Sequence, residues 1–286
     1  MSSKWLRSLF KKKKTLSPAR KDQPDSDYPT GAVTQIKTAS LQEAHSTHFN
    51  NPTDERFIDK EKQNYTYRES RRRTDMAAEQ ELASFLDSYL YKPLLEEGRF
   101  TSIKRIEEVE MQLKGVDVEA TTKTHVARID EKAQLYYINK NLPTFAFELQ
   151  FLKDAQTYTG WLLNPELLTN YYLLIWPMAT TDKVRDLKKD DFTELDALMI
   201  SRRKIHDFLD KNGFTCDILI HTADQLRQQG RLGKVKTKRS GIYYYVSDPQ
   251  KYAESPINLV IGKNHLLQLA DAHYKITKNG FERLSR

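Results

Sequence analysis

The spacing of apolar residues changes along the chain from sparse to helical and then to alternating. Residues 1–73 hold few apolar side chains, as in segments that bury too little surface to offset the entropy of folding. From Thr74 to Gly98 the apolar residues recur at helical spacing, which predicts a helix. We therefore expect a disordered basic tail over residues 1–73 and a folded domain over residues 74–286.

Beyond Gly98 the apolar period shortens to two, which indicates β-strands. The predicted strands are Phe100–Met111, Val116–Thr121, His125–Ala133, Thr144–Leu152, Tyr171–Pro177, Cys216–Ile220, Gly241–Ser247 and Ile257–Ile261. The later predicted helices are Asp190–Asn212, Thr222–Gln229 and Asn264–Ala272. This order predicts an α/β or α+β fold with a mixed central sheet flanked by helices.

Two acidic residues fall opposite each other in the predicted hairpin of residues 116–133. If Lys123 and Thr124 form its tip, Asp117 pairs with Asp130. Directly opposed residues have Cβ atoms about 4.5–5.5 Å apart, and two carboxylates at that distance repel each other. A divalent cation would remove this repulsion, and Mg²⁺ prefers carboxylate oxygens. The hairpin therefore predicts a metal site.

Lys132 follows two residues after Asp130, so strand alternation places both side chains on one face of the hairpin. An ammonium group there can stabilise a metal-bound hydroxide or the charge that develops on a phosphate. Glu131 falls on the other, apolar face, which is an objection to this register.

Three more polar residues are candidates for the same site. Glu148 and Gln150 alternate with aromatic residues in the strand Thr144–Leu152. Because polar groups are costly to bury without partners, they either extend the site or face solvent on a half-exposed strand. Glu79 lies at the border of the inward face of the first helix, where it either reaches the site or stays on the surface.

A helix with an inward glutamate, a strand with an aspartate and a strand ending in Asp-x-Lys resemble the PD-(D/E)XK nucleases. The matching stretches are Glu79–Tyr91, Gly115–Val118, Ile129–Ala133 and Phe145–Phe151. Val116 stands where the family's motif has proline. The resemblance implies a restriction-endonuclease-like core.

The resemblance also implies roles for individual residues. Asp117 and Asp130 would bind Mg²⁺ or Mn²⁺ with the backbone carbonyl of Glu131, and Glu79 would complete the site. Lys132 would orient or activate the water that attacks a phosphodiester. Supporting roles fall to Glu148 and Gln150.

The net charge of +7 favours an acidic partner, either nucleic acid or an anionic membrane surface. One basic stretch without an acid precedes Gly241 and a run of three tyrosines. It either contacts phosphates, with bases stacked on a tyrosine, or is a solvated loop. The basic residues are Arg231, Lys234, Lys236, Lys238 and Arg239.

The remaining features concern compartment and assembly. Residues 4–14 combine four apolar residues with Lys11–Lys14, so this segment either contacts a membrane surface or is a solvated basic tail. We expect no transmembrane segment, because no apolar run approaches the ~20 residues that span a bilayer. Cys216 is the single cysteine, which favours a reducing, cytoplasmic setting and a buried thiol. The sequence leaves a homodimer open.

The predicted metal site and the resemblance together imply a metal-dependent nuclease that hydrolyses phosphodiester bonds with metal-activated water. The resemblance favours DNA over RNA as the substrate. The alternative is a noncatalytic nucleic-acid-binding or regulatory protein that keeps the same fold.

Overall fold

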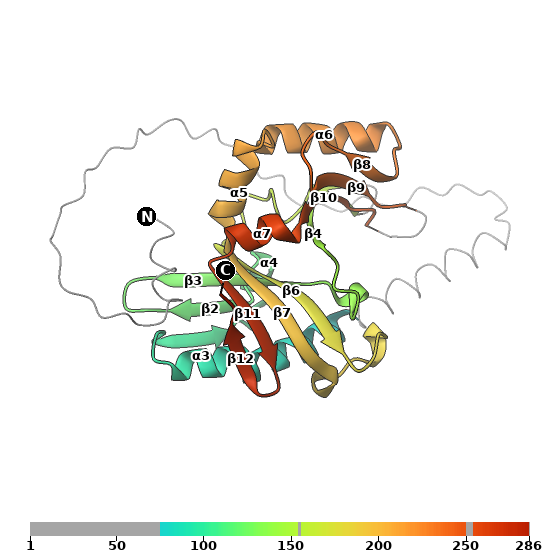
Figure 1. Ribbon diagram of the computed structural model, residues 1–286. Coiled ribbons are helices and arrows are strands. Elements are labelled where there is room, and N and C mark those ends of the chain that lie inside the picture. The colour runs from blue at the N-terminus through green and yellow to red at the C-terminus, as the bar shows by residue number, and fades with distance from the viewer. Residues whose placement is uncertain (1–74, 154–155, 250–253, 286) are drawn as a thin grey trace, which may run out of the picture. The chain divides into compact units, whose positions relative to one another are not determined.

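A helix opens the part of the chain that the computed structural model describes, which is residues 75–153, 156–249 and 254–285 (Figure 1). Residues 75–86 are α-helical, η1 (Asp87–Tyr91) is a π-helical turn, and α3 (Lys92–Glu96) follows. The helix ends before Gly98, whose φ of +70° is a left-handed conformation that glycine adopts at little cost. The predicted first helix is confirmed over this range.

The main sheet has seven strands in the order β1-β2-β3-β6-β7-β11-β12. Strands β3 and β6 run parallel, and the other neighbouring pairs run antiparallel. Their bounds are β1 (Ser102–Arg105), β2 (Val118–Thr121), β3 (Val126–Ala133), β6 (Tyr171–Ala179), β7 (Phe192–Ser201), β11 (Ala272–Thr277) and β12 (Gly280–Arg283). The prediction of a mixed central sheet in an α/β fold is confirmed.

A second, antiparallel sheet has five strands in the order β5-β4-β10-β9-β8. Its strands are β4 (Thr144–Lys153), β5 (Gln156–Thr159), β8 (Gly233–Lys236), β9 (Ile242–Val246) and β10 (Ile257–Gly262). The later helices are α4 (Val109–Leu113), α5 (Arg202–Lys211), α6 (Cys216–Gln228) and α7 (Lys263–Leu269). Short 3₁₀ turns are η2 (Leu135–Tyr137), η3 (Val184–Asp186) and η4 (Lys189–Asp191).

The two faces of the main sheet bury separate apolar clusters. On β6, Leu173 and Ile175 pack with the first helix, whereas Tyr172 and Leu174 pack with the second sheet and helices α5–α7. This division follows from the strand period of two, which sends alternate side chains to opposite faces. A residue's place in a strand of this sheet therefore decides which of the two layers it meets.

The helix predicted over Asp190–Asn212 is wrong in its first half, where β7 runs in the middle of the sheet. Its two faces are both buried, because Met199 belongs to one apolar cluster and Leu198 to the other. A strand buried on both faces is a nearly continuous apolar run, without the alternation that identifies half-buried strands. The second half of the predicted helix is α5.

Two other predicted strands differ from the structure. The strand predicted over Phe100–Met111 is only β1, and α4 follows it. The strand predicted over Cys216–Ile220 is the start of α6, because the Thr215 side chain accepts a hydrogen bond from Ile218 N and caps a helix there. Cys216 is consequently exposed in the first turn. Strands β5, β8, β11 and β12 were not predicted.

The predictions for the N-terminal tail and for a transmembrane segment remain to be compared with the structure. Both the tail of residues 1–73 and its segment 4–14 lie outside them. Among the described helices, none is both long enough and apolar enough to cross a membrane.

Candidate active site

The hairpin of β2 and β3 has the predicted register. Val118 pairs with Ile129 and Thr121 with Val126, so the tip lies at Lys123 and Thr124. At the open end, Asp117 departs from the ladder, since its backbone N–H donates to Ile129 O at 2.9 Å. The next strand N–H, that of Glu131, donates a hydrogen bond to the side chain of Asp117 and not to a backbone carbonyl of β2. The distance from Glu131 N to Asp117 Oδ2 is 2.7 Å. The two strands thus begin to separate at Asp117.

Asp130 is a buried carboxylate with one unpaired oxygen. Its side chain is 2% exposed, and its Oδ1 accepts from Lys132 Nζ at 2.5 Å. Its Oδ2 is buried without a hydrogen-bond partner among the described residues. Burial raises the pKa of Asp130 to about 7, with Lys132 opposing the shift and the neighbouring Asp117 carboxylate adding to it. The two carboxyl groups are therefore close enough to interact, although Asp117 and Asp130 are not the directly opposed pair that the register predicted.

Lys132 holds its ammonium group between acidic and aromatic neighbours. Its Nζ lies 5.5 Å from the centre of the Trp161 ring as well as beside Asp130. Burial lowers the pKa of Lys132, but the charges of Asp130 and Asp117 outweigh it and raise the pKa overall. Lys132 therefore stays protonated and neutralises part of the acidic pair.

Glu131 points to the opposite face, as the register requires, and the structure explains how the apolar layer accommodates it. Its carboxylate accepts from Tyr91 Oη at 2.7 Å and from the Arg105 guanidinium at 3.0 Å. Arg105 also donates to Asp87 at 2.8 Å. Tyr91 and Asp87 both belong to η1 (Asp87–Tyr91), and Arg105 ends β1. Hydrogen bonds from the π-helical turn and from β1 therefore hold Glu131, which is next to Asp130 on β3.

Glu148 joins this site from the other sheet. Burial raises its pKa to about 7, the Glu254 charge adds to the shift, and the Lys132 charge opposes it. Its backbone lies against Gly160, where an added Cβ would approach Glu148 O to 2.4 Å. The close approach of Gly160 therefore fixes Glu148 near Trp161, whose ring also contacts Phe147 at 5.3 Å.

Gln150 does not share this site, contrary to the prediction. Opposite Ile257 the β4 ladder holds an extra residue, so Leu149 and Gln150 are both buried instead of alternating. The Gln150 amide donates to Asp224 and accepts from Arg227, both at 2.6 Å. The bulge thus turns Gln150 away from Glu148 and toward α6.

Glu79 is exposed on the first helix, which is the surface position that the sequence left open as one of its two alternatives. Crowding by the surrounding protein raises its pKa, Lys132 opposes the shift, and Asp75 and Asp117 add to it. Because water screens charges at an exposed position, these interactions have small energetic weight. Glu79 is near the site without being held in it.

The donor set fits a hard divalent cation in part. Asp130 offers the free oxygen Oδ2, and the neighbouring Gly115 presents no side chain there, since an added Cβ would lie 3.5 Å from that oxygen. Within the described residues, no group of three or more His, Cys, Asp or Glu side chains is arranged to hold a metal ion. The ligands available to a cation are therefore the Asp117 and Asp130 carboxylates and the backbone carbonyl of Glu131. In this structure the Lys132 ammonium group balances part of the carboxylate charge.

Several residues that shape the site were not predicted from the sequence. Arg105, Tyr91 and Trp161 reach it from segments far along the chain, and no local pattern marks them. Gly115 has a φ of +74°, and an added Cβ would lie 2.5 Å from Thr169 Oγ1. A glycine directly before the Val-Asp-Val segment was the one available sequence signal.

The basic stretch borders β9 at the edge of the second sheet. Lys234 and Lys236 are exposed on β8, and Lys234 Nζ lies 3.9 Å from the centre of the Tyr243 ring. None of the five basic side chains forms an ion pair with another described residue. These side chains are Arg231, Lys234, Lys236, Lys238 and Arg239.

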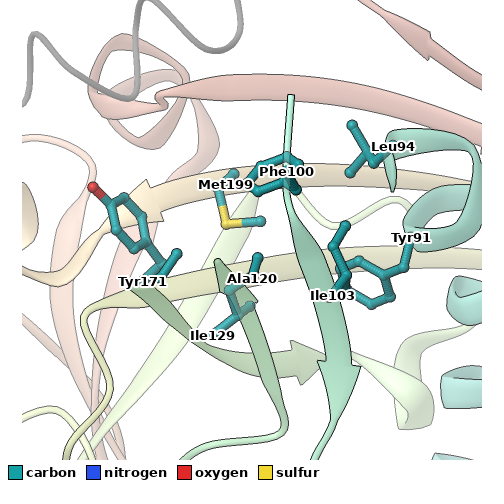
Figure 2. A pocket seen from close by; sticks show the side chains of 9 residues that line it. Tyr91, Leu94, Phe100, Ile103, Ala120, Ile129, Tyr171 and Met199 are labelled. Atoms are coloured by element: carbon teal, nitrogen blue, oxygen red, sulfur yellow. The ribbon is translucent and has the colours of Figure 1, made fainter. Parts of the chain in front are cut away.

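An apolar pocket lies on the other face of the main sheet (Figure 2). Ile129 lines it, and strand alternation turns Asp130 and Lys132 away from it. The remaining lining side chains come mainly from the first helix and neighbouring strands, including Tyr91, Leu94, Phe100 and Met199. With no polar group converging on it, this pocket is separate from the candidate active site.

Comparison of the chain with protein-family models, curated proteins and solved structures finds no match.

The contact between Gly160 and Glu148 gives a test of the site's packing. We expect Gly160→Ala to destabilise the protein by about 1–3 kcal/mol, because the new Cβ forces the backbone of β4 to move. Urea unfolding of purified protein measures the effect. Gly262→Ala is the matched control, since its Cβ would come no closer than 3.4 Å to another atom. Equal stability of the two variants would contradict the proposed contact.

Proposed function

We propose that this chain is a metal-dependent nuclease that hydrolyses phosphodiester bonds, with DNA as the preferred substrate. The observation that carries the proposal is the buried, unpaired Oδ2 of Asp130 beside Asp117, with the Lys132 ammonium 2.5 Å from Oδ1. An acidic pair with an adjacent amine suits the binding of a cation and of a phosphate. The same residues carry the resemblance to PD-(D/E)XK nucleases, which supports the proposal.

Each residue has a role that its position supports. Asp117, Asp130 and the backbone carbonyl of Glu131 would hold Mg²⁺ or Mn²⁺, with Glu79 at the margin. The bound cation would lower the pKa of a water and offset charge on the phosphate. Lys132 would orient that water or the scissile phosphate.

Glu148 lies close enough to Lys132 for their charges to interact. The Trp161 ring lies 5.5 Å from the same amine. A reducing, cytoplasmic setting fits the free and exposed Cys216.

The raised pKa values predict how the metal-free protein responds to pH. Asp130 and Glu148 have pKa values of about 7 in the folded protein, above their ordinary 3.8 and 4.5. Their contribution to stability is therefore greatest below pH about 4 and is lost as pH rises through about 7. Thermal unfolding in EDTA between pH 5 and 8 should show a falling Tm, with a flatter profile for Asp130→Asn. Parallel profiles would contradict these pKa values.

A cleavage assay tests the activity. Purified full-length protein is incubated with labelled single-stranded DNA, duplex DNA and RNA, with Mg²⁺, Mn²⁺ or EDTA. We expect cleavage with either metal, none in EDTA, and a strong loss in Lys132→Met. Binding without cleavage in both metals would favour the alternative, a noncatalytic nucleic-acid-binding or regulatory protein.

A further inference from the structure

One row of side chains crosses the second sheet and ends at Glu148. Lys234 on β8 pairs with Tyr245 on β9, Tyr245 pairs with Asn258 on β10, and Asn258 pairs with Glu148 on β4. Figure 1 shows the strands of this sheet next to one another, as the pairing requires. Paired residues in antiparallel strands project to the same face, so the four side chains form a continuous line.

The row lies on the face of the second sheet that does not form its apolar core. The neighbouring row, Val235, Tyr244, Leu259 and Phe147, packs into the buried cluster instead. Lys234 is exposed and Tyr245 is 44% exposed. Accordingly, a ligand can reach the β8 and β9 end of the row without displacing the core.

The exposed end of the row has the chemistry of a nucleic-acid surface. Residues 231–247 contain five basic residues and no acidic residue, and Lys234 packs over the Tyr243 ring at 3.9 Å. Lysines neutralise backbone phosphates, and exposed tyrosines stack on bases. A base must be unpaired to stack on a side chain that projects from a sheet, so this surface suits a single strand better than a duplex.

The other end of the row reaches the candidate active site. Glu148 packs against Gly160, and the ring of the next residue, Trp161, lies 5.5 Å from Lys132 Nζ. Lys132 in turn donates a hydrogen bond to Asp130. Three spacings between neighbouring strands separate Lys234 from Glu148, which is about 14 Å. That length corresponds to about four nucleotides at the ~3.4 Å rise of a stacked strand.

From this continuity we infer that the row Lys234–Tyr245–Asn258–Glu148 is a track for single-stranded nucleic acid that leads to Asp130 and Lys132. The inference rests on the proposed nuclease function and names its substrate as an unpaired strand. Lys234 and Lys236 hold the phosphates, Tyr245 stacks on a base, and Asn258 offers its amide to the strand. An anionic membrane surface is the competing occupant of the basic end.

Binding measurements separate this inference from the nuclease proposal. The full-length Asp130→Asn protein in EDTA is titrated into a fluorescein-labelled 12-nucleotide DNA, and fluorescence anisotropy reports the Kd. We expect Tyr245→Ala in this background to weaken binding at least about fivefold, because one stacking contact is lost. We expect Lys234→Ala to weaken binding less and to lower the slope of log K against log salt by about one.

Matched variants distinguish the track from general charge. Tyr245→Phe keeps the aromatic ring and should retain the affinity, and Lys92→Ala removes an exposed lysine from the first helix and should change little. Equal affinities for the single strand and its duplex, or an unchanged Kd in Tyr245→Ala, would overturn the track. Loss of sedimentation with phosphatidylserine vesicles in Lys234→Ala, with DNA binding intact, would overturn it in favour of a membrane.

The two proposals fail in different ways. If the wild type cleaves DNA but Tyr245→Ala changes neither the Kd nor the KM, the track is wrong and the nuclease stands. If Tyr245→Ala weakens the binding of DNA but no metal supports cleavage, the nuclease is wrong and the surface binds DNA without cutting it. A rise in KM with an unchanged kcat is the result expected when both are right.

Discussion

Asp130→Asn should lower the rate of DNA cleavage about a thousandfold and leave the protein folded. Asparagine has the size of aspartate, so it preserves the packing of a residue that is 2% exposed. It removes the negative charge that pairs with Lys132 and the free oxygen that would bind a cation. Single-turnover cleavage of labelled DNA with Mn²⁺ measures the loss.

The direction of the stability change separates this result from misfolding. Burial raises the pKa of Asp130 to about 7, so its charged form is unfavourable in the metal-free protein above that pH. Asp130→Asn should therefore be at least as stable as the wild type at pH 8 in EDTA. Asp186→Asn, on an exposed turn, is the control and should keep full activity. Full activity in Asp130→Asn would remove Asp130 from the mechanism.

Arg105→Ala should destabilise the protein by about 2–4 kcal/mol, because it leaves the Glu131 carboxylate without its guanidinium partner. The Glu131 side chain is 9% exposed and cannot regain its hydration easily. Arg105 is 24% exposed, which places the expected loss below that of a fully buried pair. Urea unfolding at pH 7 measures the difference.

The preceding residue on the same strand, Lys104, provides the control for Arg105. Lys104 pairs with Glu108, but both side chains are more than half exposed, so Lys104→Ala should cost less than about 1 kcal/mol. Arg105→Met with Glu131→Gln removes both charges and should recover part of the lost stability. Similar losses in Arg105→Ala and Lys104→Ala would show that the contact of Arg105 with Glu131 does not stabilise the fold.

The hairpin was predictable because its register depends on a short local tip. Once Lys123 and Thr124 close the turn, the strand period of two decides which side chains share a face. That reasoning placed Asp117, Asp130 and Lys132 together, and the structure brings them together. The turn and the strand period were therefore sufficient to predict that these three residues lie together.

Other parts of the site depend on contacts that a single strand pattern does not encode. Gln150 left the site because of one extra residue in β4, and nothing in the alternation of that strand marks the bulge. Glu131 looked misplaced because its partner Arg105 lies 26 residues away. The central strand β7 looked helical because burial on both faces hides its period.

Titration of the metal-free protein with Mn²⁺ by isothermal calorimetry tests the central claim most directly, at pH 7 and in two buffers of different ionisation enthalpy. The claim predicts one Mn²⁺ site in the wild type, proton release on binding because the pKa of Asp130 is about 7, and no binding in Asp130→Asn. Equal Mn²⁺ affinity in both proteins, or no binding in either, would contradict it.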